Sequence, residues 1–185
     1  MRKDLMETKE IIKYMTSAMK PRNECLDLAL DRGLGEGMQI EKWILIEMLA
    51  KLIQLRKDGF VDNAEGEHKY PIKKTSRYEH SDLWWCVDHE QHWLEVKTIV
   101  VSKDQQRGSM DEIFKDLDKK NRLHPTDIFH HLTIVFPVES SNKKYWRNQL
   151  DFIYKRNGLA YEANWNYEMG HRQLLFMLFT QVGRQ

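Results

Sequence analysis

The alternation of apolar and polar positions is strongest in the middle of the chain. Aromatic and β-branched residues fill Leu83 to Val87 and again Trp93 to Val101, and the polar run Asp88 to His92 separates the two stretches. This pattern predicts two strands joined by a short hairpin connection. Because successive side chains of a strand point to opposite faces, Glu95 and Lys97 are expected to share one face of the second strand.

A longer apolar pattern with helical spacing precedes the hairpin. From Gln39 to about Lys57 this pattern predicts a helix with one apolar stripe, and Gly59 is expected just past its C-terminus. The stripe consists of Ile44, Leu45, Met48, Leu49, Leu52 and Leu55. Glu41 falls in the middle of the stripe, whereas Glu47 falls beside it. Of these two glutamates, Glu41 is therefore the one on the apolar side of the helix.

The remaining pattern predicts further elements on both sides of these. Those before the hairpin are a helix over residues 4–20 that Pro21 ends, a shorter helical segment over 23–32, a polar loop over 62–68 and a first strand over about 69–78. Those after it are a loop over 102–109, a helix capped by Ser109 that runs to about Leu123, a strand over 131–138, a helix over 142–157, an ill-defined aromatic stretch over 159–169 and a strand over 173–179. The strand over 131–138 is apolar on both faces and is expected in the centre of the sheet.

This order of elements predicts an α/β fold with a central mixed sheet flanked by helices. Residues 1–38 are expected to form an N-terminal helical extension, and residues 39–185 one compact domain. The 185 residues, 41% hydrophobic and 31% charged, are enough for a sizeable core. No apolar run has the length of a membrane span and no signal peptide pattern is present, so a cytoplasmic location is expected. Cys25 and Cys86 lie in apolar contexts, which favours reduced thiols over a disulfide.

The hairpin carries charged side chains that need partners. Asp82 opens the first strand, and antiparallel pairing would bring it near Glu95. A carboxylate and an ammonium on one face of an apolar strand are costly to bury unless each is compensated. Asp82, Glu95 and Lys97 are therefore expected to meet at one edge of the sheet. Two carboxylates suit a hard divalent cation such as Mg²⁺.

Asp82 followed by Glu95-Val96-Lys97 on the next strand resembles the PD-(D/E)xK motif of the restriction-endonuclease-like nuclease superfamily. The resemblance covers roughly Gln39 to Val138, and Ser81 stands where the motif has its proline. It implies a restriction-endonuclease-like core and metal-dependent hydrolysis of phosphodiester bonds in DNA. Mg²⁺ is the cofactor that it implies, and Mn²⁺ is expected to substitute.

The resemblance also implies roles for individual residues. Asp82, Glu95 and the carbonyl of Val96 would hold the metal, and Lys97 would orient the attacking water and offset charge in the transition state. Glu41 would support the metal site from the helix. In the alternative interpretation, Glu41 is only a first-turn residue that the helix dipole favours.

Two basic stretches are candidates for nucleic-acid binding. They contain Lys73, Lys74 and Arg77 before the hairpin and Lys103 and Arg107 after it. Such residues could follow a phosphate backbone of DNA, or of RNA, which the sequence does not exclude. A solvated edge strand and an ordinary polar loop are the alternatives. The formal net charge of +1 decides neither way, because a nuclease can confine its positive charge to one groove.

Other function classes have less support in the sequence. The eight histidines have no zinc-site spacing, and the chain has no P-loop, GxGxxG or GxSxG motif. Two alternatives to a nuclease stay open: a catalytically silent module on the same fold that binds nucleic acid or protein, and a structural protein in which Glu95 and Lys97 form a salt bridge. A homodimer is possible, with Tyr161 to Tyr167 as a candidate interface.

Overall fold

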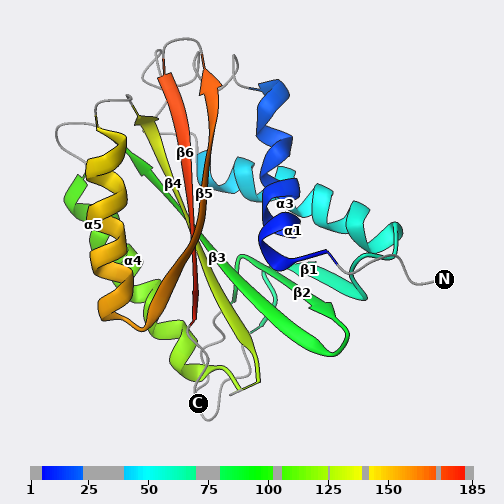
Figure 1. Ribbon diagram of the computed structural model, residues 1–185. Helices are drawn as coiled ribbons and strands as arrows, with labels where there is room; N and C mark the ends of the chain where they lie inside the picture. Colours follow the sequence, from blue (N-terminus) through cyan, green and yellow to red (C-terminus); the bar gives the residue numbers. More distant parts are fainter. Residues whose placement is uncertain are drawn as a thin grey trace.

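The computed structural model describes residues 6–22, 40–69, 80–101, 106–124, 126–138, 142–169 and 172–181. In these ranges six strands form one sheet in the order β1-β2-β3-β4-β6-β5 (Figure 1). The strands are β1 (Asn63–Gly66), β2 (Leu83–Val87), β3 (Glu90–Val100), β4 (Ile128–Val138), β5 (Leu159–Met169) and β6 (Arg172–Gln181). β3 and β4 pair in parallel and the other neighbours pair antiparallel. The sheet is therefore mixed, as the sequence predicted.

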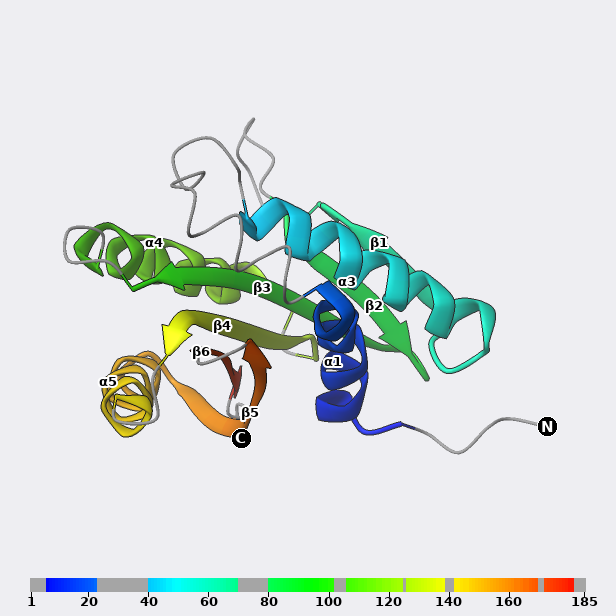
Figure 2. The same cartoon turned by 90° about the horizontal axis from the view of Figure 1, so that it is seen from above.

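Helices cover both faces of this sheet. They are α1 (Thr8–Thr16), the 3₁₀ helix η1 (Ser17–Arg22), α3 (Ile40–Lys57), α4 (Gln106–Lys119), the 3₁₀ helix η3 (Lys120–Arg122) and α5 (Lys143–Arg156). In Figures 1 and 2, α1 and α3 lie on one side of the sheet and α4 and α5 on the other. The α/β class and the flanking helices are confirmed.

Strand alternation divides the buried apolar side chains into two clusters. Leu94 and Val96 of β3 pack with α1 and α3, whereas Trp93 and Ile99 of the same strand pack with α4 and α5. β4 contributes buried residues to both clusters, which confirms its central position. The charged residue Glu95 lies between Leu94 and Val96 in sequence, so it faces the α4 and α5 side.

α3 agrees closely with its predicted apolar pattern. It starts one residue later than expected, and its stripe residues Ile44, Met48, Leu52 and Leu55 are buried. The helix ends in a Schellman motif, in which the N–H of Phe60 donates to the carbonyl of Leu55 at 3.0 Å and the N–H of Gly59 donates to that of Arg56 at 3.1 Å. Gly59 is thus the residue past the helix end that the sequence predicted.

Gly59→Ala should lower the free energy of unfolding by about 1 kcal/mol, because an L residue strains in the left-handed region. Gly59 has a φ of +77°, and a Cβ there would meet no atom within 4 Å, so the cost comes from the backbone alone. Urea unfolding measures it, with Gly59→Asn as the control that tolerates this conformation and keeps part of the stability. Equal stability of Gly59→Ala and the wild type would contradict the left-handed cap.

Two predictions around the hairpin were wrong in detail. Residues 63–66, predicted as part of a polar loop, form strand β1, because Ala64 is buried opposite Trp85. The hairpin connection is two residues, Asp88 and His89, with φ of 48° and 72°, and not the five residues 88–92. A two-residue turn with both φ values positive matches the twist of paired strands, so residues 90–92 extend β3.

The predicted helix boundaries also needed correction. α4 begins at Gln106, so Ser109 lies inside the helix and does not cap it, and the turn after Lys119 is a 3₁₀ helix. α1 likewise gives way to a 3₁₀ turn at Ser17, four residues before Pro21. The aromatic stretch over 159–169 is strand β5, whereas α5, β4 and β6 lie within a few residues of their predicted ranges. Residues 23–32 and most of 69–78 lie outside the described residues.

The aromatic stretch suggested as a dimer interface contributes to the protein's own core. Trp165 and Tyr167 are buried against the N-terminal helix, where the Trp165 Nε1–H donates to Thr16 Oγ1 at 3.0 Å. The Tyr161 hydroxyl accepts a hydrogen bond from the Asn164 side chain, and its ring packs edge-on against Phe179. These contacts tie β5 to α1 and β6.

Candidate functional site

The candidate site lies where β2 and β3 separate. Their register ends at Leu83 opposite Leu94, while β3 continues to Val100. Past Leu94, two carboxylates accept hydrogen bonds from the β3 backbone. Asp82 Oδ2 accepts the Val96 N–H at 2.7 Å, and Glu41 Oε2 accepts the Thr98 N–H at 2.9 Å. Side-chain oxygens thus take the positions that a neighbouring strand's carbonyls would occupy.

Glu41 connects α3 to the lysine of the motif. Its second oxygen, Oε1, lies 3.4 Å from Lys97 Nζ, and both side chains are partly buried. Its two oxygens therefore contact neighbouring positions of one strand, the Lys97 ammonium and the Thr98 N–H. This geometry places Glu41 at the hairpin, on the apolar side of its helix as the stripe predicted.

Glu95 is paired with a lysine of α4, the helix on the face of the sheet to which its side chain points. Its side chain is 1% exposed, and Lys119 Nζ of α4 lies 2.7 Å from its Oε2. The same ammonium lies 3.1 Å from Asp116 Oδ1, one turn earlier on α4. Lys119 therefore bridges two carboxylates, and such charge-assisted contacts offset part of the cost of burying Glu95.

A chain of polar contacts continues from Asp116 into the core. Asp116 Oδ2 lies 3.9 Å from Nε2 of the fully buried His131, too far for a direct hydrogen bond. His131 Nδ1 lies 2.9 Å from the Tyr154 hydroxyl, which lies 2.6 Å from Thr133 Oγ1. The candidate site is thus the outer end of a network that links β3, α4, β4 and α5.

Burial raises the pKa of both hairpin carboxyls above the usual range. Burial raises the pKa of Asp82 to about 6, although the hydrogen bond from the Val96 N–H acts in the opposite direction. Burial and the nearby charge of Asp82 raise the pKa of Glu95 to about 8, against the lowering effect of Lys119. The pKa of Lys119 is raised, because the attraction of Glu95 and Asp116 outweighs its burial. Two neighbouring carboxyls that resist ionisation mark a place where added positive charge is favourable.

Asp82 and Glu95 carry oxygen donors of the type that divalent cations such as Mg²⁺ prefer. Mg²⁺ is commonly held by one or two carboxylates with several waters, and Asp82 and Glu95 supply two. Among the described residues, no cluster of three or more His, Cys, Asp or Glu side chains is arranged to hold a metal ion. The argument for a cation between Asp82 and Glu95 therefore depends on these two carboxyls and on their raised pKa values.

The structure brings together only part of the predicted site. Glu41, Asp82, Glu95 and Lys97 surround the separation of β2 and β3, and the N–H of Val96 is bonded to Asp82. Arg107 lies in the first turn of α4, and its side chain is not described. Four basic residues of the proposed nucleic-acid surface lie outside the described residues: Lys73, Lys74, Arg77 and Lys103.

Lys119 and Asp116 were missed by the sequence prediction. Lys119 is largely buried, with its ammonium against Glu95. The available signal was the spacing of Ile113, Asp116 and Leu117, which places an acidic residue on the inward face of α4. An inward acid calls for a cationic partner, and Lys119 is three residues away.

Comparison with protein-family models, with curated proteins and with solved structures found no match for this chain. Within the ranges that the structure describes, no helix combines the length and the apolar character needed to cross a membrane.

Proposed function

We propose that this chain is a metal-dependent nuclease that hydrolyses phosphodiester bonds in DNA, with RNA as the other possible substrate. One observation carries the proposal: the buried carboxyl of Glu95 lies near the partly buried carboxyl of Asp82, both with raised pKa values, on the hairpin that also carries Lys97. A buried acidic pair is costly to keep in a site that serves stability alone. The PD-(D/E)xK resemblance supports the same interpretation.

Asp82, Glu95 and the Val96 carbonyl would hold Mg²⁺, or Mn²⁺ in its place. Such an ion supplies positive charge that stabilises the transition state of phosphoryl transfer. The ammonium of Lys97 would donate to a phosphate oxygen or to the attacking water. Glu41 of α3 contacts the Lys97 ammonium and would thereby orient it.

One observation favours the alternative of a binding module without turnover. Lys119 already contacts Glu95 at 2.7 Å and so supplies a positive charge where a metal would. In that case the hairpin carboxyls would have a structural role, and any contact with nucleic acid would not lead to cleavage. Activity and binding must therefore be measured together.

Wild-type protein with Mg²⁺ or Mn²⁺ should cleave a mixed set of single-stranded, duplex and junction DNA. Asp82→Asn and Lys97→Met should each lower the cleavage rate by about 100-fold, the usual size for loss of one group that stabilises transition-state charge. Asp118→Asn, an equivalent change at an exposed position of α4, should retain the activity.

Two results would count against the proposal. Wild-type protein that binds these substrates but cuts neither DNA nor RNA with either metal is a binding module. Full cleavage by Asp82→Asn would show that the reaction does not use the hairpin carboxylates. Calorimetric titration of Mg²⁺ into the same variants separates loss of metal binding from loss of chemistry.

A further inference from the structure

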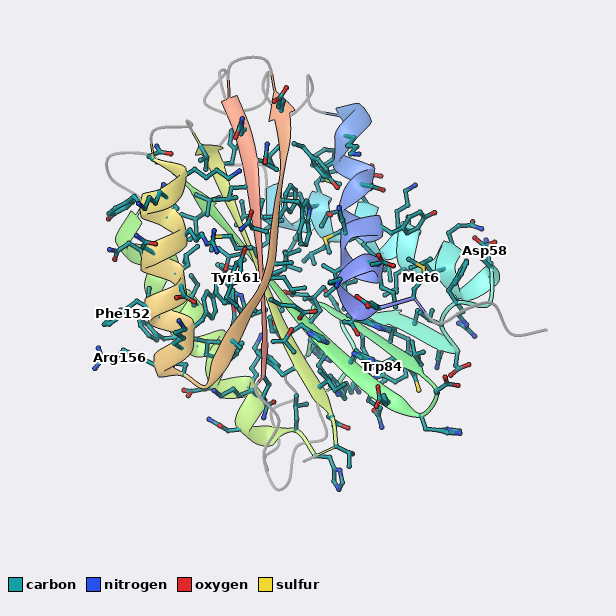
Figure 3. All side chains as sticks on the ribbon, viewed as in Figure 1. Met6, Asp58, Trp84, Phe152, Arg156 and Tyr161 are labelled. Carbon is teal, nitrogen blue, oxygen red and sulfur yellow. The ribbon has the colours of Figure 1, made fainter. Side chains whose placement is uncertain are left out.

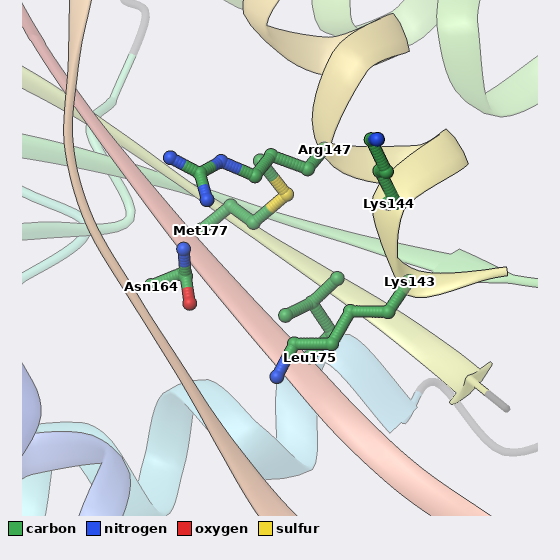
Figure 4. Close-up of a pocket in the computed structure, with 6 residues that line it drawn as sticks. All are labelled: Lys143, Lys144, Arg147, Asn164, Leu175 and Met177. Carbon is green, nitrogen blue, oxygen red and sulfur yellow. The ribbon is translucent and has the colours of Figure 1, made fainter. Parts of the chain in front are cut away.

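A polar cavity lies away from the hairpin carboxylates, between the start of α5 and strands β5 and β6. Its volume is about 360 Å³, within the range of small-ligand sites. It is lined by Lys143, Lys144, Arg147, Asn164, Leu175 and Met177. Figure 4 shows Lys143 and Arg147 reaching from α5 across β6 toward Asn164 of β5. We propose that this basic pocket binds a phosphate group.

The charge of the basic pocket has one sign. Three of its six lining residues are cations and none is an acid. Lys143 Nζ donates to the amide oxygen of Asn166 at 3.0 Å, and the Arg147 guanidinium lies 4.8 Å from the centre of the Tyr161 ring. Both contacts are with uncharged groups, so they orient the two cations without neutralising them. An anion is therefore the ligand that this pocket favours.

The position of the pocket on α5 adds to the positive potential. Lys143 is the first residue of this 14-residue helix, and Asn142 at its N-cap makes no side-chain cap hydrogen bond. A helix N-terminus carries partial positive charge and has backbone N–H groups without intrahelical partners. The field of the helix end thus has the same sign as the field of the lining side chains.

The mixture of cations favours phosphate over a carboxylate. A guanidinium can grip two phosphate oxygens at once, while ammonium groups act as point charges beside it. Three cations can balance the double charge of a phosphate monoester, or the single charges of neighbouring phosphodiesters in a strand, better than the one charge of a carboxylate. Leu175 and Met177 are buried and form an apolar wall, which suits the carbon skeleton attached to the phosphate.

The ligand could be a free nucleotide or a phosphate of a nucleic-acid strand, since both present this group. Two kinds of probe distinguish them: inorganic phosphate and adenosine 5′-monophosphate, followed by calorimetry, and a fluorescent single-stranded DNA, followed by anisotropy. EDTA in every titration prevents metal-dependent cleavage, so the result does not depend on the proposed nuclease function. Binding of the small probes indicates a nucleotide site, and binding of the strand alone indicates a backbone site.

The decisive comparison is between two double variants of α5. Lys143→Gln with Arg147→Gln should weaken binding of whichever probe the wild type binds by about tenfold, as expected for removal of two contacting cations. Lys155→Gln with Arg156→Gln removes the same two charges at the other end of the helix, where Lys155 pairs with Asp151 and Arg156 lies over Phe152 (Figure 3). This control should change the affinity by less than about twofold, the effect of net charge alone.

Equal weakening in both double variants, or no binding of any probe by the wild type, would overturn the proposal. Thermal unfolding of each variant confirms that it is folded. If the pocket variant does not fold, the exposed Lys144→Glu reverses one pocket charge without altering a buried side chain. It should also weaken binding about tenfold, and an unchanged affinity would again contradict the pocket.

Discussion

Glu95→Gln should remove the part of the pH dependence of stability between pH 5 and pH 9 that comes from the buried Glu95 carboxyl. A carboxyl whose pKa is higher in the folded than in the unfolded protein holds more protons when folded. Its contribution to stability is therefore full below the unfolded pKa and is lost as the pH rises through the folded pKa. For Glu95, burial and Asp82 move the pKa from 4.5 to about 8, so this loss spans that window.

The wild type should lose about 4 kcal/mol through Glu95 between pH 5 and pH 9, since one pKa unit corresponds to about 1.4 kcal/mol. Glutamine keeps an oxygen that can accept from Lys119 but has no proton to lose. Subtracting the two unfolding free energies at each pH removes the contribution of the other groups that titrate. The unfolding free energy of Glu95→Gln should therefore rise by about 4 kcal/mol relative to that of the wild type between pH 5 and pH 9.

Urea unfolding of both proteins at pH 5, 7 and 9 provides the measurement. Glu90→Gln is the matched control, because Glu90 lies on the same strand and is exposed. Its difference from the wild type should not vary with pH. If the difference for Glu95→Gln is equally constant, Glu95 ionises normally in the folded protein and the raised pKa is wrong.

Lys119→Met should destabilise the protein by about 3 kcal/mol at pH 9, because removing one partner of a buried ion pair leaves the other charge uncompensated. Lys119 is the cation that contacts both Glu95 and Asp116. At pH 5 the loss should fall to about 1 kcal/mol, since Glu95 is then protonated and needs less compensation. A loss that is larger at pH 9 than at pH 5 indicates lost charge compensation. A loss that is the same at both pH values indicates lost packing.

A double-mutant cycle tests this interpretation of Lys119. Adding Glu95→Gln to Lys119→Met should recover about 2 kcal/mol at pH 9, because the buried charge is removed with its partner. Lys115→Met, one turn earlier at an exposed position of α4, should change stability by less than about 0.5 kcal/mol. Additive effects of the two site substitutions would mean that Lys119 and Glu95 do not stabilise each other.

Elements with strong local periodicity could be predicted from the sequence. The apolar stripe of α3 and the apolar runs of β4 and β6 predicted the bounds of these elements to within a few residues of those observed. Each pattern is complete within its own segment, so no distant residue is needed to interpret it. β1 has only four residues, Asn63–Gly66, and its one buried side chain, Ala64, lies opposite Trp85 of the neighbouring strand. The evidence for this strand therefore lies outside its own segment. β5 has an irregular register between Tyr161 and Ala163, which breaks the alternation.

The candidate site also has contacts that the sequence predicts and one that it does not. The shared location of Asp82, Glu95 and Lys97 follows from hairpin pairing, and that of Glu41 follows from its place in the apolar stripe. The pairing of Lys119 with Glu95 joins a helix to a strand, and the spacing within α4 indicates only the inward Asp116 beside Lys119, not the partner on β3. The restriction-endonuclease-like core stays a prediction, whereas the mixed sheet with helices on both faces is confirmed.

The carboxylates along β3 also cover the part of this strand that β2 leaves unpaired. A bare strand edge offers N–H groups on which an extended segment of another molecule can pair, which is a route to aggregation. Asp82 and Glu41 occupy the N–H groups of Val96 and Thr98, so an incoming strand would have to displace charged side chains. The same residues that form the candidate site therefore protect this edge against intermolecular strand addition.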